Sequence, residues 1–142
     1  MCTTPDNATV ILVVEDDPLI HDFETAVLRR AGYHVLSATN GIDGATVFSR
    51  CFEEISLVVT DIGLPGMDGL ELGAFVRKIR PDMSLMFASG SIDANNRAAV
   101  ERIRDSRFLA KPFTAAELLA NVSELIATAG PFVSGPRVMR LL

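Results

Sequence analysis

Short apolar runs alternate with segments of helical periodicity along most of this chain, and this alternation limits the folds that it can adopt. The clearest run is Thr9 to Val14, a continuous stretch rich in valine and isoleucine, which is typical of a strand buried on both faces. Comparable runs predict strands at residues 34–38, 56–60, 84–88 and 107–110. Five strands separated by helices indicate a parallel sheet that is covered by helices on both faces.

The segment after the first run has the features of a helix. Asp17 followed by Pro18 is a strong helix start, because an aspartate oxygen caps the first turn and proline fits the first helical position. Gly32 is expected to end this helix. Its apolar positions, and therefore its predicted inner face, are Ile20, Phe23, Val27 and Leu28.

Four more helices are predicted along the chain. Thr114 and Glu117 have the spacing of a capping box, which indicates the start of the last helix. Helical periodicity or polarity predicts the other three within residues 40–50, 72–79 and about 93–104.

Length and composition narrow the class of protein. With 142 residues, of which 49% are hydrophobic, the chain is long enough for one domain with a packed core. Its net charge of −5 provides no large basic patch, which argues against direct binding to nucleic acid. The first residues lack a secretory signal, and no apolar run is long enough to span a membrane. Cys2 and Cys51 form no CxxC pair and are interpreted as free thiols, which predicts a soluble domain of the reducing cytoplasm.

Polar side chains follow the predicted strands at their carboxyl ends. Glu15 and Asp16 follow the first strand, and Asp61 follows the third. Ser89 follows the fourth strand and Lys111 the fifth. Ligands of open α/β sheets bind outside the carboxyl ends of the strands, where the strand order reverses. These five residues are therefore predicted to converge on one crevice.

The three carboxylates of this crevice need a cation, because like charges repel and burial penalises each of them. Mg²⁺ prefers oxygen ligands, and a carboxylate can act as the nucleophile that takes up a phosphoryl group. The ammonium of Lys111 and the hydroxyl of Ser89 suit two oxygens of such a group. The sequence therefore predicts a site for Mg²⁺ and phosphoryl transfer.

Four segments of the chain carry a family resemblance. They read ILVVEDDP (residues 11–18), VVTDIGLPGMDG (58–69), FASG (87–90) and FLAKPF (108–113). Asp61 precedes Ser89 by 28 positions, and Ser89 precedes Lys111 by 22. With these motifs in this order, residues 9–128 resemble the receiver domains of two-component response regulators of the chemotaxis-regulator type. The resemblance implies an α/β, flavodoxin-like fold, a doubly wound five-stranded parallel sheet of order 2-1-3-4-5 with five helices.

The same resemblance assigns the acidic residues their roles. Asp61 would be the phosphoacceptor and one of the metal ligands. Asp16 would bind Mg²⁺ directly, and Glu15 would act through water. The backbone carbonyl of Gly63 would be a further protein ligand of the ion.

The resemblance also implies a switch that responds to phosphorylation. Ser89 would occupy its hydroxyl position and Phe108 its aromatic position, whereas Lys111 would contact the phosphoryl group and form a cis peptide bond to Pro112. Phe108 lacks the hydroxyl of the more common tyrosine. Gly63 places no side chain over the phosphoryl site.

Three functions are compatible with this site. The first, implied by the resemblance, is a receiver that takes a phosphoryl group from a histidine kinase or histidine phosphotransfer protein and then changes its contact with a downstream protein. Such a receiver catalyses its own phosphorylation and dephosphorylation and is a signalling domain rather than a turnover enzyme. The second, a Mg²⁺-dependent phosphatase, is disfavoured because these enzymes usually carry an aspartate where this chain has Gly63. The third, a phosphorylation-independent binding module, is disfavoured because the acidic residues and Lys111 are all present.

The sequence predicts three parts of the chain: an N-terminal extension (residues 1–8), a receiver domain (9–128) and a C-terminal tail or linker start (129–142). It is interpreted either as a stand-alone receiver or as a receiver cut from a larger regulator or hybrid kinase. The tail carries four apolar side chains, which predict a contribution to a homodimer contact: Val138, Met139, Leu141 and Leu142.

Overall fold

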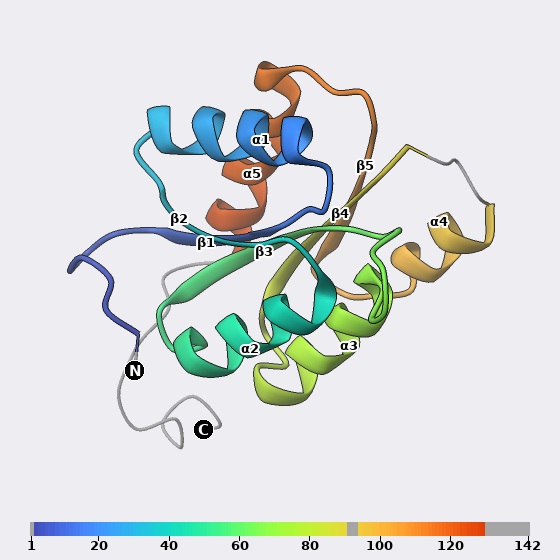
Figure 1. Cartoon of the computed structure of the whole chain (residues 1–142), viewed down its shortest axis with the longest axis horizontal. Coiled ribbons are helices and arrows are strands. Elements are labelled where there is room, and N and C mark those ends of the chain that lie inside the picture. Colours follow the sequence, from blue (N-terminus) through green and yellow to red (C-terminus); the bar gives the residue numbers. More distant parts are fainter. Residues whose placement is uncertain (1, 91–93, 130–142) are drawn as a thin grey trace.

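The computed structural model describes residues 2–90 and 94–129, which form a sheet between two layers of helices (Figure 1). Strands and helices alternate along the whole described chain, as the apolar runs predict. In chain order the elements are β1 (Val10–Val14), α1 (Pro18–Arg30), β2 (His34–Ala38), α2 (Gly41–Cys51), β3 (Ile55–Asp61), α3 (Gly69–Ile79), β4 (Ser84–Ser89), α4 (Ala94–Glu101), β5 (Ser106–Ala110) and α5 (Ala115–Ala129).

The five strands are parallel and lie in the order β2-β1-β3-β4-β5, which confirms the predicted topology. After β1 the chain adds β2 on one side, and then returns to add β3 on the other. The strand order therefore reverses between β1 and β3. Because all strands are parallel, their carboxyl ends share one edge, and the crevice at the reversal lies between the ends of β1 and β3.

The core consists of two clusters, one on each face of the sheet. Alternate residues of β1 point to opposite faces, so Ile11 belongs to one cluster and Leu12 to the other. Figure 1 shows α1 and α5 over one face, and α2 and α3 over the other. Leu28 and Leu118 fill the α1–α5 side, and Leu72 is buried on the α2–α3 side.

The inner face of α1 differs from the prediction. Glu24, Thr25 and Leu28 are its buried residues, whereas Phe23 is 39% exposed. The helix is rotated so that Leu28 and the residue one turn before it, Glu24, face the sheet. Phe23 instead lies on the flank of α1, where the centre of its ring is 6.2 Å from the centre of the Phe113 ring. The prediction is confirmed for Leu28 and for Val27, which is partly buried against the same cluster, and is wrong for Phe23. Hydrophobicity could not reveal that a glutamate shares the buried face with Leu28.

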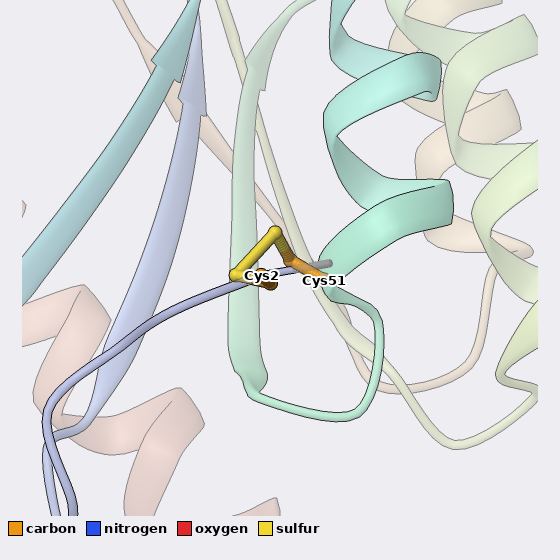
Figure 2. The surroundings of a disulfide bond; sticks show 2 residues. All are labelled: Cys2 and Cys51. Carbon is orange, nitrogen blue, oxygen red and sulfur yellow. A yellow bond between two sulfur atoms is a disulfide. The ribbon is translucent and has the colours of Figure 1, made fainter.

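The two cysteines are also placed differently from the prediction. Cys2 and Cys51 form a disulfide, with their Cα atoms 4.9 Å apart (Figure 2). The prediction of free thiols was therefore wrong for this structure. Their separation of 49 positions hid the contact. Cys2 lies shortly before β1 and Cys51 shortly before β3, and neighbouring parallel strands bring these two amino ends together.

Two further predictions concern membranes and the C-terminal tail. None of the helices within residues 2–90 and 94–129 is long and apolar enough to cross a membrane. The predicted packing of the tail, and the homodimer contact that depends on it, fall on residues 130–142, which lie outside the described residues.

Candidate functional site at the carboxyl edge of the sheet

The acidic residues that follow β1 and end β3 meet at the carboxyl edge of the sheet. Carboxylate oxygens of Glu15, Asp16 and Asp61 lie within 4.8 Å of one another. Glu15 is buried, Asp61 is partly exposed and Asp16 is exposed. The predicted convergence of these three residues is therefore confirmed. The cluster is buried at Glu15 and open to solvent at Asp16.

Asp17, the third acidic residue of this stretch, has a separate role. Its Oδ1 accepts hydrogen bonds from the backbone N–H groups of Leu19 at 2.9 Å and Ile20 at 3.4 Å, so it caps α1 as the sequence predicts. Its own N–H donates to Oε2 of Glu15 at 3.1 Å. The turn after β1 thus fixes one oxygen of Glu15 and starts the helix at the same time.

Lys111 brings a positive charge to the acidic cluster from the end of β5. Its Nζ donates a hydrogen bond to Oε1 of Glu15 at 2.6 Å and lies 3.4 Å from Oδ1 of Asp61. Its backbone N–H donates to the carbonyl of Ser89 at 2.9 Å. The peptide bond from Lys111 to Pro112 is cis, as the family resemblance implies. Lys111 therefore links the fifth strand to the acids of the first and third.

Burial and charge shift two pKa values in this site. Burial is the largest influence on Glu15 and raises its pKa, against the hydrogen bonds from Lys111 and from the N–H of Asp17. For Lys111, burial alone would lower the pKa, but the hydrogen bond to Glu15 and the charges of Asp61 and Glu15 outweigh it and raise the pKa. Lys111 therefore stays charged at neutral pH beside the two carboxylates.

The loop after Asp61 is held close to the site by a glycine at the start of α3. A Cβ atom at Gly69 would lie 2.1 Å from the carbonyl oxygen of Asp61, so a larger residue would force this helix away from the end of β3. The N–H of Gly69 also donates to the carbonyl of Ile62 at 2.9 Å. At Gly63 a Cβ atom would meet nothing within 4 Å, so there is open space beside this residue.

The two predicted switch residues lie on neighbouring strands. Ser89 ends β4 and is buried, in a register that places it opposite Ala110 of β5. Phe108 lies on β5 and packs against the cluster on the α2–α3 side. The guanidinium carbon of Arg97, on α4, lies 5.5 Å from the centre of the Phe108 ring. This cation–π contact joins α4 to β5 and was not predicted from the sequence.

Glu24 is a second residue that sequence reasoning missed. It is 2% exposed, and burial together with the negative charge of Glu15 raises its pKa to about 8. Lys111 opposes this shift and Asp61 adds to it. A signal was present, because Glu24 precedes the apolar Leu28 by one helical turn and so shares its face. A buried carboxyl group on α1 therefore lies near enough to the acidic cluster for their charges to interact.

Comparison with known proteins identifies the family. A family model described as a response regulator receiver domain matches residues 11–123. The chain belongs to the response regulator receiver domain family. The receiver is 36% identical to the response regulator receiver protein CpdR of Brucella abortus over 120 residues, which cover 84% of this chain and 98% of CpdR. It is 30% identical to the sensor kinase CckA of the same organism over 126 residues, 87% of this chain and 13% of CckA.

Solved receiver structures agree with this assignment. The crystal structure of a receiver domain protein from Clostridium thermocellum is 27% identical and superposes with a TM-score of 0.80, covering 84% of this receiver and 95% of that chain. A receiver protein from Sinorhizobium medicae is 29% identical, with a TM-score of 0.78 and coverages of 87% and 98%. Among its relatives, then, this domain makes up nearly all of one protein and a small part of another.

Family membership supports the first of the three functions considered from the sequence. The chain is a receiver domain of two-component signalling, and receiver domains take phosphoryl groups from histidine kinases. Its acidic cluster is compatible with a bound metal ion.

Proposed function

We propose that Asp61 accepts a phosphoryl group from a phosphohistidine of a histidine kinase or histidine phosphotransfer protein, with Mg²⁺ bound beside it, in a receiver unit of residues 9–128 that acts in the cytoplasm. The observation that carries this proposal is the position of Asp61. Its side chain is 12% exposed, lies among two other carboxylates and is 3.4 Å from the ammonium of Lys111. It is the carboxylate that has both a nearby cation and access from outside.

The transfer is a displacement at phosphorus. An Oδ atom of Asp61 forms the new bond to phosphorus, the bond from phosphorus to the donor imidazole breaks, and the imidazole takes up a proton as it leaves. The product is an acyl phosphate on Asp61 and a free histidine on the donor. Water can later attack the same phosphorus, and the bond from phosphorus to the Asp61 oxygen then breaks, which releases inorganic phosphate and restores the carboxylate. Gly63 places no side chain over this site, which favours access of water.

The donor groups around Asp61 fit a hard cation. Glu15, Asp16 and Asp61 offer only oxygen ligands, they bring up to three negative charges, and the outer residues are open to water. Mg²⁺ prefers this combination of carboxylates and retained waters. We assign Asp16 and Asp61 as direct ligands, Glu15 as a ligand through water and the Gly63 carbonyl as a further ligand. The ion supplies positive charge against which the phosphoryl oxygens are stabilised.

Two side chains of the chain bind the remaining phosphoryl oxygens. Lys111 is charged and fixed by its hydrogen bond to Glu15, so its ammonium is already oriented when the phosphoryl group arrives. Ser89 ends the neighbouring strand β4 and supplies a hydroxyl donor. Fixed donors of this kind stabilise the transition state because they need no reorganisation during the reaction.

The response to phosphorylation passes through Ser89 and Phe108. Once its hydroxyl binds the phosphoryl group, Ser89 moves toward Asp61 and frees space that the Phe108 ring enters. That movement breaks the contact between Phe108 and Arg97 and changes the surface formed by α4 and β5, where a downstream protein binds. Phosphorylation acts as a population shift, because the phosphorylated site binds better in one of the two states.

The donor protein docks on an apolar surface beside the acidic cluster. Leu19, in the first turn of α1, is 81% exposed, and Phe23 follows one turn later with its ring against Phe113. We call Leu19, Phe23 and Phe113 the donor surface. A histidine that reaches Asp61 has to approach this edge, and apolar side chains left in water there gain free energy when a partner covers them.

The test is the intact mass of the protein after incubation with acetyl phosphate and Mg²⁺. We expect one added phosphoryl group, which is lost in Asp61→Asn and in the presence of EDTA. Asp22→Asn is the matched control, because Asp22 is an exposed aspartate on α1, and this variant should accept the group as wild type does. The same series with a phosphorylated histidine kinase tests the protein donor.

The proposal fails if wild type gains no phosphoryl group from either donor while Mg²⁺ binding is intact. Binding of Mg²⁺ is measured separately by calorimetry, with Asp16→Asn as the variant expected to lose it. An Asp61→Asn variant that is still phosphorylated would place the acceptor elsewhere.

A further inference from the structure

The N-terminal segment, residues 2–8, is attached to the receiver mainly through its disulfide. The first hydrogen bond from the chain start to the sheet is from the N–H of His34 to the carbonyl of Thr9, at 2.9 Å. Among the described residues, the backbone hydrogen bond before it, from Ala8 to Pro5, stays inside the segment. Cys2 and Ala8 add partly buried apolar contacts to the core cluster on the α2–α3 side.

The other end of the disulfide is firmly placed. Cys51 is the last residue of α2 and is buried within the same cluster. The chain directly after it is fixed by Arg80, whose Nη1 donates to the carbonyls of Phe52 at 2.8 Å and Ile55 at 2.7 Å. The disulfide thus joins the N-terminal segment to the end of α2 (Figure 2). We expect its opening to free the N-terminal side, whereas Cys51 keeps its place.

We propose that Cys2 and Cys51 form a reversible redox clasp, which holds residues 2–8 against the end of α2 when oxidised and releases them when reduced, without altering the phosphoacceptor site. The proposal goes beyond the proposed function, since it concerns a second input at a different place in the fold. The relevant observation is a disulfide between a half-buried residue of an otherwise loosely attached segment and a buried residue of the core.

The chemistry is thiol–disulfide exchange with two thiols of a reductant, for example those of two glutathione molecules. A thiolate of the reductant attacks Sγ of Cys2, which is the more exposed partner, and the S–S bond breaks as Cys51 leaves as a thiolate and takes up a proton. The second thiol of the reductant then displaces Cys2. The products are two cysteine thiols and the disulfide form of the reductant, which has supplied two electrons and two protons. A small-molecule disulfide such as oxidised glutathione reverses the reaction.

The clasp and the phosphoacceptor site lie at opposite edges of the sheet. Cys2 and Cys51 precede β1 and β3, whereas Glu15 and Asp61 lie at the ends of these strands, which have five and seven residues. At about 3.3 Å per residue, the strands separate the two places by roughly 17 to 23 Å. Release of the segment uncovers Cys51 at the end of α2 and leaves the carboxyl edge in place.

The test uses the full chain equilibrated in glutathione buffers of increasing reducing strength. Free thiols are trapped with N-ethylmaleimide and counted by intact mass. We expect no adducts in oxidising buffers and two in reducing buffers. The melting temperature should fall by about 5 °C or more on reduction, because the closed disulfide restricts the unfolded chain. Cleavage before Asp6 by the protease Asp-N should become faster on reduction.

Cys2→Ser is the matched variant, because it removes the clasp and keeps Cys51 in the core. It should show one trapped thiol in reducing buffers, and either one thiol or one bound glutathione in oxidising buffers. Its melting temperature should vary much less with the buffer than that of wild type. Two adducts in folded wild type under oxidised glutathione would overturn the proposal, and so would no adducts in every reducing buffer. Equal melting temperatures and equal cleavage of the two forms would also overturn it.

Acetyl phosphate separates this proposal from the proposed function. Oxidised and reduced wild type should be phosphorylated at rates within about threefold of each other, as expected for distant sites, and a larger difference would contradict the independence of the two edges. If neither form is phosphorylated, the proposed function fails, whereas the clasp is still decided by thiol counts and melting temperature.

Discussion

The ammonium of Lys111 donates a hydrogen bond of 2.6 Å to Oε1 of Glu15, so the cation of the site is held by an acid from the opposite side of the crevice. We expect Lys111→Ala to slow phosphorylation by acetyl phosphate by about 100-fold or more, because one fixed donor to the phosphoryl oxygens is lost. The rate is measured by intact mass over time at saturating Mg²⁺.

The other lysine of the chain provides the control for this variant. Lys78 is exposed on α3, and Lys78→Ala should be phosphorylated at the wild-type rate. A Lys111→Ala variant that reacts as fast as Lys78→Ala would show that the ammonium takes no part in the transfer.

The buried carboxyl group of Glu24 makes stability depend on pH. Its pKa of about 8 in the folded protein lies above the ordinary value of 4.5, so the folded state binds the proton more tightly than the unfolded chain. Stability is therefore highest below pH 4.5 as far as this group is concerned, falls between about pH 4.5 and pH 8, and is constant above. The total loss is on the order of 5 kcal/mol.

Glu24→Gln should remove this dependence. We expect the variant to be more stable than wild type at pH 8.5, with a smaller difference at pH 5.5, as measured by urea unfolding. Glu53→Gln, at an exposed position, should follow the wild-type profile. Parallel profiles for Glu24→Gln and wild type over this range would contradict the assignment.

The donor surface should distinguish a protein donor from a small-molecule donor. Leu19→Glu places a charge on its most exposed apolar side chain, and we expect transfer from a phosphorylated histidine kinase to fall by about tenfold. Transfer from acetyl phosphate should be unchanged, because the acidic cluster is intact. Ile42→Glu is the control, since Ile42 is 61% exposed on α2, outside the donor surface. Equal losses with both donors would point to damage at the site rather than to docking.

Arg80 should contribute to stability without affecting phosphorylation. It is 4% exposed, and its Nη1 donates to the backbone carbonyls of Phe52 and of Ile55, the first residue of β3. Arg80→Ala leaves these carbonyls without their donor and is expected to cost about 2–4 kcal/mol of unfolding free energy, measured in urea. At low temperature, where the variant is folded, acetyl phosphate should still phosphorylate it. A change in unfolding free energy below about 0.5 kcal/mol, as at ordinary surface positions, would be incompatible with this role.

The sheet and the acidic cluster could be predicted because strong local signals coincide there. The five residues before Glu15, Val10 to Val14, are all apolar. Because the carboxyl ends of parallel strands share one edge, the meeting of Glu15 and Asp61 follows from strand order. The cap at Asp17 and the capping box at Thr114 depend on neighbours in the sequence, and the structure has both.

The misplaced residues depend on contacts between distant segments or on a rotation that hydrophobicity does not reveal. Cys2 and Cys51 meet only because β1 and β3 are neighbours in the sheet. The rotation of α1 buries Glu24 and exposes Phe23, whose ring lies beside that of Phe113, 90 positions along the chain. Arg97 reaches Phe108 only once α4 and β5 are packed together.

The two clusters of the core lie on opposite faces of the sheet, and the proposed surfaces for the phosphoryl donor and for the downstream protein are divided in the same way. The proposed donor surface lies on the side of α1 and α5, whereas Phe108 and its contact with Arg97 lie on the side of α2, α3 and α4. The sheet stands between them and is shared by both. Substitutions on the first side can change which kinase donates the phosphoryl group without changing the surface on the second side that binds the downstream protein. After gene duplication, one copy could therefore acquire a new kinase and keep its downstream protein, or acquire a new downstream protein and keep its kinase.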